Sequence, residues 1–522
     1  MATKTTVVLF WNVVFYACLA HANPCMKQSF DHCLSFVCVC NETYCDDVIP
    51  DVKQPDGVYS VYTTSEAGDR LAKRAGRFYK VHTDFHSPQE NPDVLYQLDP
   101  TVTKQTIVGF GGTFSDASGI NIAGLPEGAQ KNFIESYFGP SGIGYTLARI
   151  PIASNDMSAD VYSYDFTPGD TGLSKFTIAG YDHQYKIPYI TKAWMARQGN
   201  LSLFASPWAS PRWMKTNDNM VGFGTILPEM MKVYANYLSR FIPEYTSFMF
   251  GPQLWAITTQ NGPTRSCSND STPEYQSVCW SPHGMKDWVV KDLKRSLIDY
   301  GYPNVKIFTM DDSADVMNEW RQAFQDANAT SDIDGFAVHG YKPNDSSAMD
   351  SICETFRQHP NKTILGSEYC QLGKPLLGNW GRAVEFAERI FDNLDHCVSS
   401  FTHYDLAVDM SGGPSWVDNY ADAPVIVDND QKVFYKQPTF YMMGHFSKFV
   451  PPGAVAISLI PLKWSTETQA VGFTRPDNST VVVVGNFNDH VTSVGLLVGN
   501  YYANYTMDAN SISTFTWWKT QA

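Results

Sequence analysis

Apolar residues in the middle of the chain follow two alternating spacings. Short apolar runs typical of buried strands occur at 108–116, 145–152, 201–206, 253–259, 305–310, 335–339, 362–365 and 400–405. Apolar residues at helical spacing separate them at 127–138, near 195, and at 230–242, 287–300, 314–325 and 382–394. This alternation predicts an α/β fold, a (β/α)8 TIM barrel over 105–431. A doubly wound sheet is the alternative, but no Gly-x-Gly-x-x-Gly follows a strand.

Both ends of the chain have the period of β-strands instead. Runs at 57–64 and 78–83 alternate, and so do runs at 468–473, 479–486, 491–498 and 511–518. We expect 52–104 and 432–522 to form one all-β sandwich built from both chain ends. Residues 23–51 form a small disulfide-rich N-terminal β segment. The run at 108–116 is expected to be a strand that enters a glycine turn.

The first 22 residues have the pattern of a signal peptide. Lys4 precedes an apolar run at 7–20, and Ala20-His21-Ala22 is a small-x-small cleavage pattern. The run is too short to span a membrane. We therefore expect entry into the secretory pathway and a mature chain that begins near Asn23. Asn-x-Ser/Thr sequons predict a glycoprotein; they lie at Asn41, Asn200, Asn269, Asn328, Asn344, Asn361, Asn478 and Asn504.

Five of the eleven cysteines crowd into one short segment near the start of the mature chain. They are Cys25, Cys33, Cys38, Cys40 and Cys45. In an oxidising compartment this cluster predicts disulfides, and because five is odd, one cysteine pairs elsewhere or stays free. A zinc site is disfavoured, because neither histidines nor CxxC-like intervals accompany the cluster.

Charge and composition narrow the class of protein further. The net charge is -15 and no long basic run occurs, which argues against nucleic-acid binding. The sequence pI of about 5.2 means that this charge nearly vanishes in an acidic compartment, easing approach to an anionic membrane. Aromatic residues make up 14% of the chain, which suits sugar binding and large aromatic cores equally well.

Polar residues gather where the predicted barrel strands end. The run at 362–365 leads to Glu368, and barrel enzymes carry their chemistry at the carboxyl ends of the strands. We interpret Glu368 as a glycosidase nucleophile. One such residue is usually structural, but several on one rim favour a site. The others that we expect to bind substrate are Arg149, Asp156, Trp208, Asn261, His339, Tyr341 and Tyr404.

Long ordered motifs carry a resemblance to a known family. They include Val-Cys-Val-Cys-Asn-Glu-Thr-Tyr-Cys (37–45), Gly-Phe-Gly-Gly (109–112), Ala-Ser-Pro-Trp-Ala-Ser-Pro (205–211) and Phe-Tyr-Lys-Gln-Pro-Thr-Phe-Tyr (434–441). Over essentially the whole mature chain, the sequence resembles the acid β-glucosidases, or lysosomal glucosylceramidases, of glycoside hydrolase family 30. The resemblance implies disulfides Cys25–Cys38 and Cys40–Cys45 and leaves Cys33 as an extra thiol.

The resemblance also implies a retaining mechanism, in which one Glu attacks the anomeric carbon and a second acts as acid and base. Glu368 matches the nucleophile. The acid/base Glu should follow Asn261 in a Glu-Asn-Glu-Pro context, but this chain reads Gln260-Asn261-Gly262-Pro263. Gly262 therefore occupies the acid/base position and has no proton to donate. Neither Asp270 nor Glu274 is an evident substitute.

Other positions depart from the family pattern as well. Gly340 stands where a Trp is usual, Tyr404 and Asp405 replace Trp and Asn, and Ser415 replaces Asn. Three hypotheses follow: a working glucosylceramide hydrolase, a glycosidase for activated donors, and a catalytically impaired or inactive relative that binds glycosphingolipid or a protein partner.

The resemblance finally implies a substrate, a cellular location and a protein partner. It implies glucosylceramide as a glycosphingolipid substrate in sphingolipid catabolism, and a lysosomal location with peripheral membrane association and a saposin-type activator protein. Secretion from the cell is the alternative location. A two-carboxylate mechanism requires neither a metal nor an organic cofactor.

Overall fold

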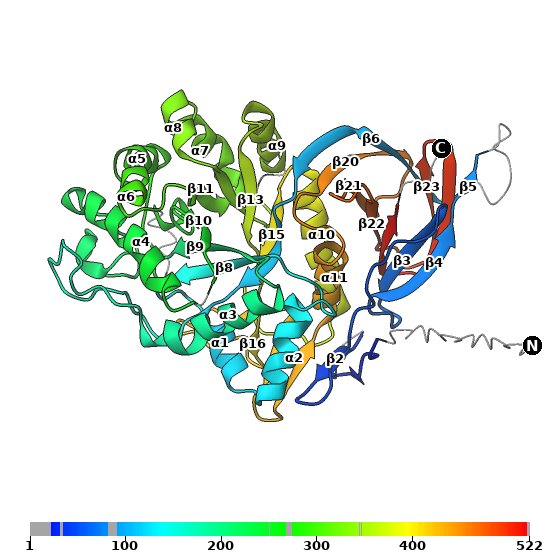
Figure 1. Cartoon of the computed structure of the whole chain (residues 1–522), viewed down its shortest axis with the longest axis horizontal. Coiled ribbons are helices and arrows are strands. Elements are labelled where there is room, and N and C mark those ends of the chain that lie inside the picture. The colour runs from blue at the N-terminus through cyan, green and yellow to red at the C-terminus, as the bar shows by residue number, and fades with distance from the viewer. Residues whose placement is uncertain are drawn as a thin grey trace, which may run out of the picture.

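The structure is a computed structural model that describes residues 22–31, 35–81, 91–249, 251–267, 274–343, 345 and 347–518. A barrel surrounded by helices lies beside a β-sandwich, and the N-terminal segment runs along the edge of both (Figure 1). The predicted signal peptide falls almost entirely outside the described residues.

The barrel consists of eight parallel strands. In sheet order they are β13 (Thr363–Glu368), β12 (Gly335–His339), β11 (Lys306–Ser313), β10 (Leu254–Thr258), β9 (Ser202–Pro207), β8 (Leu147–Ile152), β7 (Gly109–Thr113) and β15 (Ser400–His403). The barrel closes between β13 and β15, where the Ser399 N–H donates to the Ile364 carbonyl at 2.8 Å. The predicted (β/α)8 fold is therefore confirmed.

The glycines of β7 lie within the strand, which corrects the expected glycine turn. A Cβ atom on Gly111 would lie 1.8 Å from the carbonyl oxygen of Leu147 on β8. The two strands approach so closely that only glycine fits here, so the glycines serve close packing of the strands.

Helices cover the outside of the barrel. They are α1 (Asp116–Ala123), α2 (Glu127–Phe138), α3 (Ile187–Ala196), α4 (Met231–Thr246), α5 (Pro282–Trp288), α6 (Lys294–Asp299), α7 (Met317–Ala323), α8 (Ala327–Asp332), α9 (Ala348–Gln358), α10 (Trp380–Asp395) and α11 (Pro438–Ser447). In α10 the Asn379 side chain caps the first turn, and one apolar face is buried. Every residue of α11 is buried, so this helix has no polar face. Its sequence therefore lacks the amphipathic spacing by which a surface helix is predicted.

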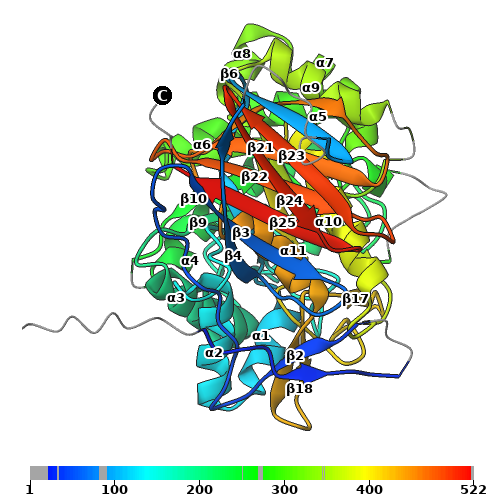
Figure 2. The same ribbon diagram turned by 90° about the vertical axis from the view of Figure 1, so that its right-hand side faces the viewer.

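One ten-stranded sheet forms the sandwich from both chain ends (Figure 2). Its N-terminal strands are β3 (Val58–Ser65), β4 (Ala72–Arg77), β5 (Tyr79–Lys80) and β6 (Val94–Thr106). Its C-terminal strands are β20 (Val455–Lys463), β21 (Thr468–Thr474), β22 (Thr480–Asn486), β23 (Thr492–Val498), β24 (Tyr501–Met507) and β25 (Ser511–Trp517). Strands β3 and β25 pair directly, and residues of β3, β6, β22, β23 and β25 share one apolar core.

A separate five-stranded sheet holds the N-terminal segment. Its order is β1 (Lys27–Gln28), β2 (Val37–Cys40), β19 (Val433–Lys436), β18 (Val425–Asp428) and β16 (Val408–Asp409). The sandwich boundary expected at residue 432 is therefore too early. The alternating run at 433–436 resembles a sandwich strand, but its hydrogen bonds go to β2 and β18. A further pair, β14 (Gln371–Leu372) and β17 (Ala421–Asp422), lies apart.

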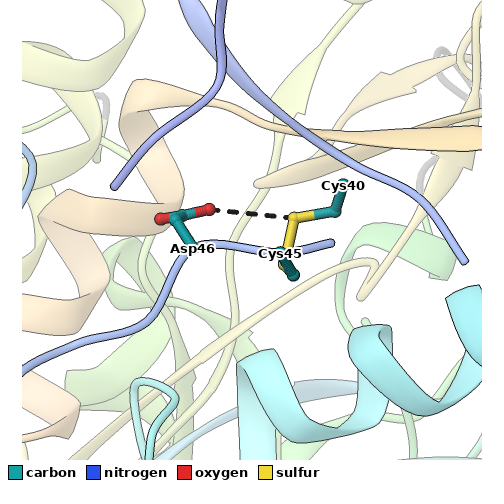
Figure 3. A group of neighbouring side chains, drawn as sticks. All are labelled: Cys40, Cys45 and Asp46. Carbon is teal, nitrogen blue, oxygen red and sulfur yellow. Dashed lines mark hydrogen bonds between the residues drawn. A yellow bond between two sulfur atoms is a disulfide. The ribbon is translucent and has the colours of Figure 1, made fainter. Parts of the chain in front are cut away.

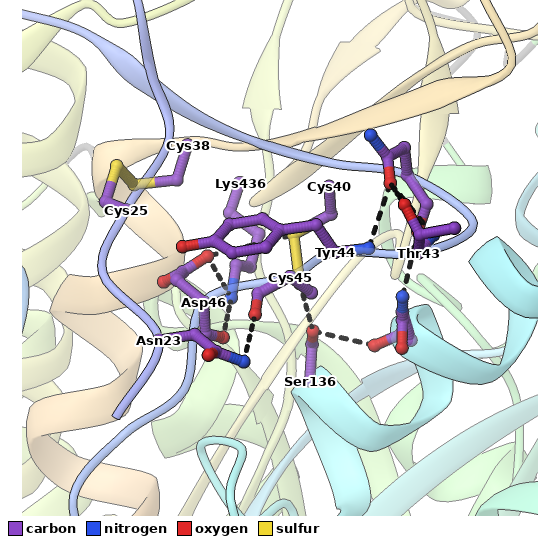
Figure 4. Close-up of a disulfide and its surroundings, with 12 residues drawn as sticks. Asn23, Cys25, Cys38, Cys40, Thr43, Tyr44, Cys45, Asp46, Ser136 and Lys436 are labelled. Carbon is purple, nitrogen blue, oxygen red and sulfur yellow. Dashed lines mark hydrogen bonds and ion pairs between the residues drawn. A yellow bond between two sulfur atoms is a disulfide. The ribbon is translucent and has the colours of Figure 1, made fainter. Parts of the chain in front are cut away.

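Two disulfides cross-link the N-terminal segment. Cys25–Cys38 and Cys40–Cys45 are both present, as the resemblance implied (Figure 4). Cys33 lies outside the described residues. The sequence did not reveal two further disulfides, Cys267–Cys279 and Cys353–Cys397.

One group among the described residues has metal-like spacing: Cys40, Cys45 and Asp46 (Figure 3). Both sulfur atoms belong to one disulfide, so neither offers a thiolate. The Asp46 carboxylate pairs with the Lys436 ammonium at 2.7 Å. These donors do not fit a metal ion.

Most of the sequons lie on the surface. Five of the asparagines are exposed, at 200, 328, 361, 478 and 504, and Asn41 is half-buried. Asn269 and Asn344 fall outside the described residues. Glycosylation of these sites stays a prediction. No helix among the described residues is both long enough and apolar enough to cross a bilayer.

Candidate active site

Glu368 is the last residue of β13 and faces a cavity of about 360 Å³ at the carboxyl ends of the barrel strands. Its carboxylate accepts a hydrogen bond from the Tyr341 hydroxyl at 2.9 Å and forms an ion pair with Arg149. His339 Nδ1 lies 3.4 Å from the same oxygen that Tyr341 contacts. Three predicted site residues therefore hold Glu368 in one orientation.

Arg149, on β8, is fully buried beneath the cavity and organises its floor. Its guanidinium donates to Ser206 Oγ at 3.0 Å, to Asn261 Oδ1 at 2.9 Å and to Asp311 Oδ2 at 2.8 Å. It also lies over the Trp208 ring, 4.7 Å from the centroid. Burial opposes the charge, yet Asp311 and Glu368 raise the pKa of Arg149 above its usual value.

Asp311, on β11, is a site residue that the sequence did not single out. It is fully buried and accepts hydrogen bonds from Thr258 Oγ1 at 2.7 Å and from His339 Nε2 at 3.2 Å. Burial alone would raise the pKa of Asp311, but Arg149 and His339 hold it well below the usual range. Its position at the end of the predicted strand 305–310 was the available signal.

A second cluster of cavity-lining residues surrounds the Asp156 carboxylate. The Tyr404 hydroxyl donates to Asp156 Oδ1 at 2.7 Å, and the Asn419 amide donates to Asp156 Oδ2 at 2.8 Å. The Tyr404 and Trp208 rings stack at 5.9 Å. Burial raises the pKa of Asp156. Stacked rings beside hydrogen-bonding oxygens are suited to a sugar ring with its hydroxyl groups.

The structure brings all the predicted site residues together. All of them except Arg149 line the cavity, and Arg149 lies directly beneath it. The sequence missed other lining residues, which are Met157, Arg265, Tyr275, Asp312, Ser313, Cys370, Leu372, Asn419 and Ala421. Several of these are far along the chain from any motif, so only the closed barrel gathers them.

Gly262 leaves one wall of the cavity open. It follows β10 with φ +53°, and a Cβ atom there would have no heavy atom within 4 Å. Its N–H donates to the Asp311 carbonyl at 2.9 Å. Of the two substitute acids weighed, Glu274 is exposed and does not line the cavity, and Asp270 lies outside the described residues.

Asp312 is the carboxyl group in this wall, but it anchors the loop that carries Gly262. Asp312 Oδ2 accepts the N–H of Thr264 at 2.8 Å, and Oδ1 accepts the N–H of Ser313 at 2.8 Å. Burial raises the pKa of Asp312. Both oxygens are thus engaged by the backbone, which favours a structural role.

The other residues that differ from the family pattern also make specific contacts with their neighbours. The Gln260 amide nitrogen donates to the carbonyls of Trp208 at 2.7 Å and Pro207 at 3.1 Å, which an ionised carboxylate could not do. A Cβ atom on Gly340 would lie 3.1 Å from the Phe401 ring, so a side chain there would require this ring to shift. Ser415 Oγ donates to the Asp156 carbonyl at 2.7 Å and thereby helps to position the segment that carries Asp156.

The Tyr275 wall of the cavity is fastened by a disulfide and a lysine. Cys267–Cys279 closes the loop that carries Tyr275. The buried Lys215 ammonium donates to the Ser277 carbonyl at 2.7 Å and to the Met220 carbonyl at 3.2 Å. These contacts join the loops after β9 and β10.

Replacing Cys267 and Cys279 together with serine should destabilise the fold by about 3 kcal/mol, because the unfolded chain regains the entropy of that loop. Urea unfolding measures this loss. The matched control is the double serine variant of Cys353 and Cys397, whose disulfide lies away from the cavity. We expect both double serine variants to be less stable than the unchanged protein. Only the variant of Cys267 and Cys279 should bind ligand more weakly. If both variants weaken ligand binding equally, this loop has no role in the site.

Stability should be greatest at mildly acidic pH. Burial opposes the His339 charge, but Glu368 and Asp311 raise the pKa of His339 above 6.5. The folded protein therefore binds a proton that the unfolded chain has released, and stability falls as pH rises from about 6.5 through the raised value. The raised pKa of Asp156 acts in the same direction above about pH 4.

The measurement is the melting temperature between about pH 4 and pH 8. His339→Asn should flatten the decline above about pH 6.5, whereas His490→Asn, at an exposed position, should not. A melting temperature that climbs steadily to pH 8 would contradict this account.

Comparison with known proteins identifies the family of the chain. The model of the glycosyl hydrolase family 30 TIM-barrel domain matches residues 107–450, and that of the family 30 beta sandwich domain matches residues 453–515. The chain is 36% identical over 475 residues to lysosomal acid glucosylceramidase of Mus musculus, covering 89% of this chain and 90% of the relative. It is 36% identical over 481 residues to putative glucosylceramidase 2 of Caenorhabditis elegans, covering 90% of each.

Solved structures agree on the fold. SrfJ from Salmonella typhimurium superposes with a TM-score of 0.80 at 26% identity, covering 88% of this chain and all of SrfJ. The two family models together span the barrel and the sandwich strands after it, and the relatives match along most of their length. The chain therefore belongs to glycosyl hydrolase family 30, as a glucosylceramidase-like glycoside hydrolase.

Proposed function

We propose that this chain forms a covalent β-glucosyl intermediate on Glu368 by the retaining mechanism, with glucosylceramide as its natural substrate class. The observation that carries the proposal is the pairing of an intact nucleophile with an open acid/base position. Arg149, Tyr341 and His339 orient Glu368, while Gly262 presents no carboxyl group to the cavity.

Each part of the site then has a role. Trp208 and Asp156 would bind the sugar, and Glu368 would attack the anomeric carbon. A ceramide alkoxide is a poor leaving group and normally departs with a proton from the acid/base residue. General acid catalysis contributes roughly 10²–10⁴ in rate, so hydrolysis of glucosylceramide by this chain should be slow by about that factor.

The relatives and the sequence support a proposal for the cellular location and the pathway of this protein. The mouse relative is named as lysosomal, and the N-terminus of this chain has the pattern of a signal peptide. We propose a lysosomal glycoprotein that acts in sphingolipid catabolism at a membrane surface, with a saposin-type activator protein, and with no metal or organic cofactor in the reaction.

A second candidate is a protein that binds glycosphingolipid without turning it over. It is favoured by the sugar-facing wall, where Asp156, Tyr404 and Asn419 are joined by hydrogen bonds while the acid is missing. Binding requires this wall and does not require a proton donor.

The test uses 2,4-dinitrophenyl β-glucoside at about pH 5, with and without azide. This aglycone departs without a proton, so release of dinitrophenolate measures attack by Glu368 alone. Azide is small enough for the open space beside Gly262 and can attack the glucosyl intermediate. We expect acceleration by azide and a β-configured glucosyl azide product, both abolished in Glu368→Gln.

The alternative outcome is equally definite. If no dinitrophenolate appears with or without azide, while glucosylceramide still raises the melting temperature, then the chain is a binding protein.

A further inference from the structure

We infer that this cavity is adapted to β-glycosides whose leaving group departs as a carboxylate, held by Arg265. The inference rests on the proposed function, because it requires Glu368 to attack the anomeric carbon. It adds a class of substrate for which the missing acid/base residue costs little.

Arg265 is a cation at the cavity, and no described carboxylate forms an ion pair with it. It lies three positions after Gly262, is exposed, and lines the same cavity as Glu368. No carboxylate among the described residues lies within 4.0 Å of its guanidinium, in contrast to Arg149 beneath the cavity floor. A guanidinium can bind a carboxylate through two parallel hydrogen bonds.

The wall beside Arg265 can accept an anion. A glutamate at position 262 would occupy the space beside the leaving group. Gly262 instead leaves open space there. Asp312, an acidic residue that lines the same cavity, accepts hydrogen bonds from the backbone N–H groups of Thr264 and Ser313, and burial raises the pKa of Asp312.

Carboxylate departure removes the need for a general acid. An alcohol has a pKa near 16 and must be protonated as it leaves, whereas a carboxylic acid has a pKa of about 4 and leaves as a stable anion. In the first step, a Glu368 oxygen forms a bond to the anomeric carbon. The bond from that carbon to the acyl oxygen breaks, and its electron pair goes to the departing carboxylate, which Arg265 binds.

The departed carboxylate can also supply the missing base. Held by Arg265 in the space beside Gly262, it takes a proton from water as the water oxygen bonds to the anomeric carbon. The ester bond to Glu368 breaks and its electron pair returns to the Glu368 carboxylate. The products are the free sugar and the carboxylic acid, so atoms and charge balance without another reactant.

Two donors that need no acid separate this inference from the proposed function. In 1-O-benzoyl-β-glucose the leaving group is a carboxylate; in N-(β-glucosyl)pyridinium it is neutral pyridine. Reaction in ¹⁸O-labelled water shows which bond breaks, because label enters glucose when the anomeric bond is cleaved and enters benzoate when the acyl bond is cleaved.

The variants are Arg265→Gln and, as the matched control, Arg212→Gln, an exposed arginine that does not line the cavity. We expect label in glucose. We expect Arg265→Gln to lower kcat/KM for the benzoyl ester by about tenfold, as for loss of one charged hydrogen-bonded pair. The pyridinium donor, which is cationic before cleavage, should not be slowed, so the ratio of kcat/KM for the ester to that for the pyridinium should fall by about tenfold or more. Arg212→Gln should leave this ratio unchanged.

Each other outcome has one meaning. If the pyridinium donor reacts but the ester does not, or if Arg265→Gln changes both donors equally, the inference about Arg265 is wrong and the proposed nucleophile stands. If neither donor reacts, the proposed function itself fails. Label in benzoate would show acyl cleavage and would also overturn the inference.

Discussion

Gly262→Glu is expected to raise the rate of glucosylceramide hydrolysis by roughly 10²–10⁴-fold. The new carboxyl group would donate a proton to the ceramide oxygen and later accept one from water. The side chain can start out from the backbone without a clash, since a Cβ atom at this position meets no heavy atom within 4 Å. The same change should weaken azide acceleration with the dinitrophenyl substrate, because the side chain would fill the space that azide uses.

The variant also has a structural cost. The φ of +53° at Gly262 disfavours any residue with a Cβ atom by about 1–2 kcal/mol, so the melting temperature should fall by a few degrees. Gly262→Gln has the same shape and strain but no acidic proton, and it should lose the same stability without gaining activity. Equal activity of the Gln and Glu variants would show that the acid/base assignment is wrong.

Arg149→Gln is expected to cause the largest loss of both folding stability and activity. Two fully or largely buried carboxylates, Asp311 and Glu368, share this guanidinium, and removing it leaves both without their ion pair. Breaking a buried pair typically costs about 3–5 kcal/mol. Urea unfolding should show this loss, and dinitrophenolate release should fall because the nucleophile is no longer held in place.

Arg149→Lys separates charge from geometry. Lysine keeps one positive charge but cannot contact Ser206, Asn261, Asp311 and Glu368 at once as the guanidinium fork does. We expect it to recover part of the stability and little of the activity. If Arg149→Gln unfolds at the urea concentration of the unchanged protein, the buried network is not what holds the site together.

The barrel could be predicted because each of its strands is short, apolar and bounded by helical spacing, so local periodicity carries most of the information. The site could be predicted in part for a related reason. In a parallel barrel every strand ends at the same face, so polar residues such as Glu368 and His339 at strand ends must converge. Helix α11 escaped prediction, since a helix buried on every side has no amphipathic period.

The sequence by itself determined the chemistry that is possible at each position: a carboxylate at Glu368, no proton donor at Gly262, and strands and helices in a known order. Only the tertiary structure decided which groups meet. Asp311 neutralises Arg149, 162 residues away, and Cys267 pairs with Cys279. The run at 433–436 joins the N-terminal segment and not the sandwich. Such pairings depend on strand register and barrel closure, which arise from packing over the whole chain and leave no local pattern.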